Sequence, residues 1–191
     1  MKKILTILLA FACAFALFSC GETGVTVGDF KNAINNTTPA EIEITIVQQT
    51  ANGPLTSEMT TTFAEDDSFT IEGFYERFTS ASSSEDKETI AINVSCSASG
   101  SYSDGGSFAG NNPASTGAKL NLGAKKLAYT ISSDGKVLTA TVDAANTKSV
   151  LGVEYASDVV LVVTVNEGVV ISYTLNYTNE FGEVSVVCSY N

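Results

Sequence analysis

Four cysteines are the strongest candidates for chemistry in this sequence, because a thiol can form a thioether or a disulfide. Cys20 ends an apolar run and begins a polar, glycine-containing stretch, Cys13 lies inside that run, and Cys96 and Cys188 lie far along the chain. Histidine is absent, which excludes Ser-His-Asp and Cys-His nucleophiles, histidine-ligated metals and imidazole acid–base catalysis. We therefore expect no enzyme activity, catalytic residues, metal site or cofactor.

The first nineteen residues have the pattern of an export signal. Lys2 and Lys3 precede an apolar run over residues 4–18, and the small residue Ser19 follows it. As a helix this run would be about 22 Å long, shorter than the roughly 30 Å that a permanent membrane span must cross. The pattern is typical of a signal peptide that is removed. It divides the chain into a signal (residues 1–19), a tether (20–26) and a single domain (27–191).

The end of this signal, Leu17-Phe18-Ser19-Cys20, resembles the lipobox of bacterial lipoproteins. In that family a leucine three residues before the cysteine, and a small residue just before it, direct lipid attachment and cleavage. Phe18 departs from the small residue usual at its position. The resemblance implies a diacylglyceryl thioether on Cys20, cleavage before it, and fatty acids such as palmitate as the anchor. Two or three acyl chains hold a protein lastingly at a membrane.

The resemblance also implies a place in the cell. Gly21 does not supply the acidic signal that keeps some lipoproteins at the inner membrane, so the bacterial outer membrane is expected. Two other interpretations stay open at the amino terminus. An ordinary secretory signal would leave Cys20 as a free or paired thiol. Lipid on Cys13 would shorten the apolar run and leave an apolar stretch on the mature chain.

The mature chain is strongly acidic. Residues 1–19 hold two of the ten Lys and Arg residues and none of the 21 Asp and Glu residues, so the 172 residues that remain carry a formal net charge of −13. Such a surface repels phosphate backbones. We expect no nucleic acid partner, a membrane contact made through the lipid on Cys20, and an unidentified protein or glycan partner.

Hydrophobic periodicity predicts a mainly β fold. Val27, Phe30 and Ile34 recur at helical spacing and predict one short helix over residues 28–36. Beyond Pro39 apolar and polar residues alternate with a period of two, as in strands with one wet face. Turn residues separate the runs. About nine strands are expected in an antiparallel meander, as a curved sheet, half-barrel or sandwich, at residues 41–47, 55–63, 69–78, 88–98, 125–132, 136–143, 159–165, 169–178 and 183–190.

Two further features of the β region concern its organisation. Residues 150–155 are compatible with a bulged extension of the next strand or with a separate short strand. The apolar positions predict one inner face, formed by Ile42, Ile44, Ile46, Phe69, Ile71, Ile90, Ile92, Leu161, Val163, Ile171 and Leu175. In outline, a helix followed by a long meander resembles the half-barrels of periplasmic lipoprotein carriers. That resemblance implies a pocket for a hydrophobic ligand, while a face packed on itself or on the helix is the other interpretation.

Two candidate sites remain outside the signal. Cys96 and Cys188 are in phase with the inward-facing residues of their strands, so a disulfide and two separate buried thiols are both compatible with the sequence. Residues 97–117 contain 11 Gly or Ser residues among 21, which is typical of a loop with little to bury. Tyr102 and Phe108 are its aromatic residues and would be its partner contacts.

Overall fold

The structure, a computed structural model, describes residues 24–66, 68–79, 86–96, 120–123 and 127–191, without the side chain of Cys96. Its strands form one antiparallel nine-stranded sheet, in the order β4-β3-β2-β1-β9-β8-β7-β6-β5, which confirms the predicted mainly β fold. The strands are β1 (Glu41–Thr50), β2 (Gly53–Phe63), β3 (Phe69–Phe78), β4 (Lys87–Cys96), β5 (Ala128–Ile131), β6 (Val137–Val142), β7 (Val159–Asn166), β8 (Val169–Asn179) and β9 (Gly182–Tyr190).

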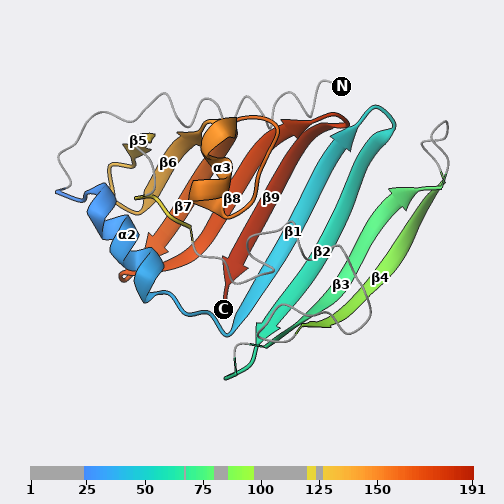
Figure 1. The fold of residues 1–191 in the computed structure, drawn as a ribbon, viewed down its shortest axis with the longest axis horizontal. Helices are drawn as coiled ribbons and strands as arrows, with labels where there is room; N and C mark the ends of the chain where they lie inside the picture. The colour runs from blue at the N-terminus through green and yellow to red at the C-terminus, as the bar shows by residue number, and fades with distance from the viewer. Residues whose placement is uncertain (1–23, 67, 80–85, 97–119, 124–126) are drawn as a thin grey trace.

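The sheet consists of two meanders joined side by side. β1 to β4 follow one another outward in one direction and β9 to β5 in the other, so the first and last strands pair at the centre (Figure 1). This central pair runs from Ile42 opposite Tyr190 to Gln48 opposite Val184. The sheet stays open, because β4 and β5 are its two edges.

Tight turns set the register of neighbouring strands. Glu167 and Gly168 join β7 to β8 with positive φ angles of 51° and 80°, the combination that a two-residue type I′ hairpin requires. Gly182 opens β9 with φ of 144°, and a Cβ there would lie 1.8 Å from the carbonyl oxygen of Gln49. The close approach of the β1 backbone therefore requires glycine at this position.

The predicted helix is present as α2 (Val27–Asn36). Thr26 caps it, since its hydroxyl accepts from the Gly28 N–H at 3.1 Å and its own N–H donates to the Asp29 carboxylate at 2.7 Å. Phe30 and Ile34 are buried, and the helix packs on β7 and β8. At its end the Thr37 hydroxyl donates to the Ala33 carbonyl at 2.7 Å and accepts from the Val170 N–H at 2.8 Å, which fastens α2 to β8.

The connection between β6 and β7 is helical, so both predictions for residues 150–155 were wrong. It contains the 3₁₀ turn η3 (Ala144–Asn146) and the helix α3 (Thr147–Leu151), which ends at Gly152 with a φ of 79°. Val150 and Leu151 are fully buried. A single turn carries too few residues for its helical period to stand out in the sequence.

Both helices lie over the β6–β9 half of the sheet, and neither lies over β1–β4 (Figure 1). We call the face that they cover the inner face. The predicted inner-face residues belong to the buried core or contact it, except for Ile90, which is half-buried and outside that core, and Ile171. Ile171 is 42% exposed and Val170 is buried in its place, because Thr164 pairs with Ser172 while Val165 pairs with Val170. Ile171 is therefore the extra residue of a β-bulge, which shifts the alternation by one position.

Candidate functional site

Directly opposed residues of antiparallel strands share a face, so the register defines rows of side chains across the inner face. The central row runs through all nine strands and consists of Ile92, Gly73, Met59, Ile44, Cys188, Tyr173, Val163, Leu138 and Ile131. The row is apolar except near its middle, where β9 and β8 contribute a thiol and a phenol. Within this row, the polar groups are therefore those of Cys188 and Tyr173.

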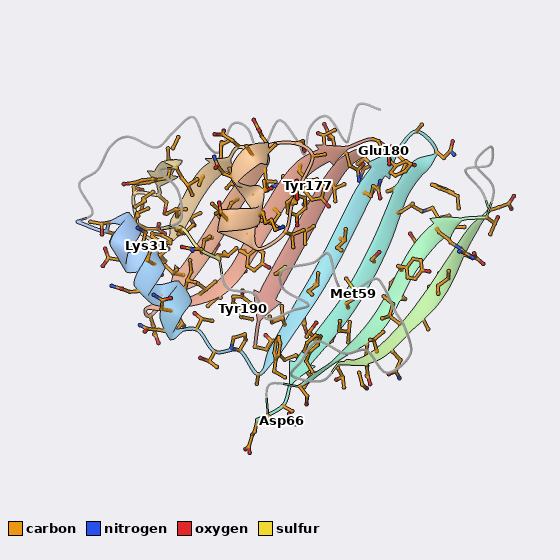
Figure 2. All side chains as sticks on the ribbon, viewed as in Figure 1. Lys31, Met59, Asp66, Tyr177, Glu180 and Tyr190 are labelled. Atoms are coloured by element: carbon orange, nitrogen blue, oxygen red, sulfur yellow. The ribbon has the colours of Figure 1, made fainter. Side chains whose placement is uncertain are left out.

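A cluster of tyrosines surrounds Cys188. The rings of Tyr173 and Tyr190 meet edge to face with centroids 5.9 Å apart, and the rings of Tyr155 and Tyr177 lie 4.6 Å apart. Figure 2 labels Tyr177 on β8 and Tyr190 on β9. Tyr155 reaches the cluster from the segment after α3, where its N–H donates to the Thr147 hydroxyl at 2.9 Å. We call these four tyrosines and Cys188 the tyrosine cluster.

Burial keeps the groups of the tyrosine cluster uncharged. It raises the pKa of the Cys188 thiol to about 12, and it raises the pKa of Tyr155, Tyr173 and Tyr190 well above the ordinary value. Removal from water penalises the charged form, and the neighbouring thiol adds to the effect on these three tyrosines. A thiol held in its protonated form is a poor nucleophile. The cluster is thus a set of neutral hydrogen-bonding groups.

Among the residues that the structure describes, two buried hydroxyls on the inner face have no hydrogen-bond partner, namely Thr61 Oγ1 and the Tyr173 hydroxyl. Thr61 on β2 is 0% exposed and lies between Ile42 and Ile71. The Cys188 thiol lies near enough to the Tyr173 hydroxyl to affect its pKa, but it makes no hydrogen bond of ordinary geometry. A buried hydroxyl without a partner costs about 1–3 kcal/mol. Both groups therefore have unused capacity to bind a polar atom.

A small pocket opens between α2 and the β5–β6 edge. Its volume is about 190 Å³, and its walls include Val27, Leu122, Tyr129 and Leu138. Among the described residues that line it, Lys31 supplies the only charged group, and Figure 2 shows this residue on α2. An apolar pocket with one cation at its wall suits an apolar chain that ends in an anion or a polar group.

A second hollow lies around Gly73 and is acidic. Glu43, Glu58 and Glu72 come from three adjacent strands and line a hollow of about 370 Å³. Gly73 has φ of 150°, and a Cβ there would lie 2.0 Å from the Glu58 carbonyl oxygen, so the backbones of β2 and β3 approach closely. Within the described ranges no group of three or more acidic, cysteine or histidine residues could hold a metal ion.

The structure decides between the two interpretations of Cys96 and Cys188. Cys96 lies on β4 and Cys188 on β9, with β3, β2 and β1 between them, and Cys188 is a free, buried thiol. Four strand spacings of about 4.8 Å separate the two strands, whereas the Cα atoms of a disulfide lie within about 7 Å. The possible disulfide is therefore not formed within the chain. The alternation along β9 correctly predicted that Cys188 faces inward, but it contains no information on which strands are neighbours in the sheet.

The remaining predicted site residues, Cys20, Tyr102 and Phe108, lie outside the described residues. The tyrosine cluster was not predicted. Tyr173 and Tyr177 lie two residues before and after the inward-facing Leu175 in β8, and Tyr190 lies two residues after Cys188 in β9. The alternation along these strands could therefore have indicated that the three tyrosines face inward. Tyr155 lies in an irregular segment, and no periodic signal was available for it. In the part of the chain that the structure describes, no helix is long and apolar enough to span a membrane.

Comparison with known proteins does not identify a family for this chain. No family model and no curated protein matches the chain. Among solved structures, LprF from Mycobacterium bovis aligns with a TM-score of 0.46 and 11% sequence identity, over 85% of this chain and 90% of that chain. Similarity at this level is too low to transfer a function.

Proposed function

We propose that this chain is a lipid-anchored protein of the bacterial cell envelope, at the outer membrane, and that it acts as a non-enzymatic surface or structural module that binds a protein or glycan. One observation carries the proposal: Leu17-Phe18-Ser19-Cys20 follows a basic start and an apolar run. This motif places an acyl-accepting thiol at the head of a compact, acidic β domain.

The chemistry of the described domain supports a non-enzymatic role. The chain has no histidine, and its buried thiol and phenols have raised pKa values, which keep them protonated near neutral pH. Two ion pairs occur among the described residues, Arg77 with Glu88 and Lys87 with Glu76. Both join neighbouring strands at the β3–β4 edge. None of these groups pairs a nucleophile with a base.

Metabolic labelling with a palmitate analogue tests the anchor. The wild-type chain should incorporate label and enter the membrane fraction, and Cys20→Ala should do neither. Cys13→Ala is the matched control, because it removes a thiol of the same apolar segment and should label like wild type. Equal labelling of Cys20→Ala, or loss of label in Cys13→Ala, would remove the basis of the proposal. Protease treatment of intact cells then separates surface exposure from residence in the periplasm.

A second candidate function, carriage or sensing of a hydrophobic ligand on the inner face, is favoured by the two hydroxyls without partners. An apolar ligand with a carbonyl or ester oxygen would satisfy Thr61 or Tyr173 while its chain contacts apolar residues such as Ile44 and Met59. The pocket beside Lys31 offers a further apolar surface.

Native mass spectrometry of the gently purified protein tests this second candidate. A non-covalent ligand should appear as an added mass in the wild type, and the double variant Thr61→Val with Tyr173→Phe should retain several times less of it. Thr60→Val, one position along β2 on the opposite face, should retain as much as wild type. A wild-type protein without added mass, while Cys20 still labels, would reject the carrier and leave the anchored module intact.

A further inference from the structure

The pocket between α2 and the β5–β6 edge has an apolar interior and polar side chains where it meets solvent. α2 lies at the β5–β6 end of the sheet (Figure 1). The buried residues of the lining are Leu122, Leu138 and Ala140. Lys31 on α2 is half-buried and Tyr129 on β5 is 50% exposed. A ligand in this pocket would therefore place its apolar part inside and its polar part beside Lys31 and Tyr129.

Lys31 has no anionic partner in the part of the chain that the structure describes. The ion pairs there belong to Arg77 and Lys87. The residues three and four positions from Lys31 on α2, where helical ion pairs form, are uncharged. Asp29, the acidic residue of α2, accepts instead from Thr26. Because a cation that is partly removed from water gains from a partner, Lys31 favours an anion at this pocket.

The ammonium group of Lys31 lies against an ordered segment of backbone. A Cβ atom at Gly123 would lie 3.5 Å from Lys31 Nζ and 3.6 Å from Lys31 Cε. The Gly123 N–H donates to the Asn121 side-chain oxygen at 3.2 Å, and the Asn121 N–H donates to the Val150 carbonyl at 2.8 Å. These bonds connect the segment to α3. A lysine already held beside the pocket loses less conformational freedom when it binds a ligand.

The volume of the pocket limits the size of the ligand. It is about 190 Å³, and an apolar protein cavity of about 150 Å³ binds benzene. Sites for drug-sized ligands measure about 300–1,000 Å³, so a long acyl chain is too large for this pocket. An apolar body of about six carbon atoms fits, with its charged group outside the apolar interior.

We propose that this pocket binds a small monocarboxylate with an apolar body of about six carbon atoms, such as benzoate or hexanoate. The carboxylate accepts charge-assisted hydrogen bonds from Lys31, and the Tyr129 hydroxyl is a second donor at the opening. Charges farther away than the Debye length of about 8 Å are screened at physiological ionic strength, so Lys31 outweighs the net negative charge of the chain.

This inference goes beyond the proposed function. The site differs from the one proposed at Thr61 and Tyr173, and it holds whether or not a ligand binds there. It also does not depend on the lipid anchor.

Ligand-observed ¹⁹F NMR of the full-length protein in detergent micelles tests the ligand class. The probe is 4-fluorobenzoate, and 4-fluorobenzamide is its neutral counterpart of the same shape. The benzoate should bind about tenfold more tightly, because a hydrogen bond to a charged group is stronger than one to a neutral group. Unlabelled benzoate or hexanoate should displace the probe, and the stronger competitor shows whether the pocket prefers a ring or a chain. Micelles without protein give the background.

Substitution of Lys31 tests the cation. Lys31→Met keeps the apolar stem and removes the charge, so it should weaken binding of 4-fluorobenzoate about tenfold and leave that of 4-fluorobenzamide unchanged. Lys31→Arg should retain most of the affinity. Lys148→Met is the matched control, because it removes an exposed lysine of α3 outside the pocket lining, and it should have no effect. Equal affinities for the two probes, or equal effects of Lys31→Met and Lys148→Met, would overturn the proposal.

Methyl NMR of the same protein tests the location. The probe 4-fluorobenzoate should shift the methyl resonances of Leu122 and Leu138 and leave that of Met59 on β2 unchanged. The double variant Thr61→Val with Tyr173→Phe should bind the probe like wild type. Shifts at Met59 alone, or loss of binding in the double variant, would place the ligand elsewhere and refute this site. A wild-type protein that does not bind 4-fluorobenzoate would also refute it and would leave the anchored module unaffected.

Discussion

The same substitution, threonine to valine, should change stability in opposite directions at two buried positions. Thr61 and Thr37 are both buried, but Thr61 Oγ1 has no partner, whereas the Thr37 hydroxyl donates to Ala33 and accepts from Val170. Valine keeps the shape of threonine and removes the hydroxyl. Only the hydrogen bonding therefore distinguishes the two variants.

The structure allows the magnitude to be worked out for each site. At Thr61 valine removes a desolvated hydroxyl that gains nothing, so the free energy of unfolding should rise by about 1–3 kcal/mol. At Thr37 valine leaves the Val170 N–H without its acceptor and should lower that free energy by a similar amount, about 1–3 kcal/mol. In a chain of this length each kcal/mol shifts the melting temperature by roughly 2–4 °C.

The assay is denaturant unfolding of ligand-free protein, followed by circular dichroism, with thermal melting as a second readout. Thr37→Ser is a further control, because it restores the hydroxyl and should recover most of the loss. A Thr61→Val variant that is less stable than wild type would refute the reasoning, since it would mean that the hydroxyl is satisfied in solution. Destabilisation by both substitutions to the same extent would have the same consequence.

Three other predictions concern a turn, a helix cap and the tyrosine cluster. Gly168→Ala should lower the free energy of unfolding by about 1–2 kcal/mol. Gly182→Ala should lower it by more, because only at Gly182 would the new Cβ meet a backbone oxygen, that of Gln49. Equal losses in denaturant unfolding would contradict this prediction. Thr26→Ala should cost about 1 kcal/mol and speed amide hydrogen exchange in the first turn of α2, whereas unchanged exchange would mean that the cap contributes nothing. Burial raises the pKa of the Cys188 thiol to about 12, so on raising the pH the unfolded chain loses this proton first, from near pH 9. The free energy of unfolding should therefore fall between pH 9 and 12, by up to about 1.4 kcal/mol per pH unit. Cys188→Ala should flatten that slope.

The local elements were predictable because each depends on its own residues. Alternation placed nine strands and their wet and dry faces, and the spacing of Val27, Phe30 and Ile34 placed α2 within one residue of its observed start. Ile171 marks where such reasoning fails. A bulge is a property of two paired strands, so the phase of one strand read alone could not indicate that Val170 takes the inward position.

The sequence by itself determined the acidic charge, the absence of histidine and the period of the strands, because these follow from residue types and short spacings. Only the tertiary structure decided which strands are neighbours. It paired β1 with β9 and kept β4 three strands away from that pair, which separated Cys96 from Cys188. It also gathered Tyr155, Tyr173 and Tyr190 around that thiol. The physical reason is that the order of the strands depends on how the whole sheet buries its inner face and limits its exposed edges. Contacts between residues distant in the sequence therefore have no local signal.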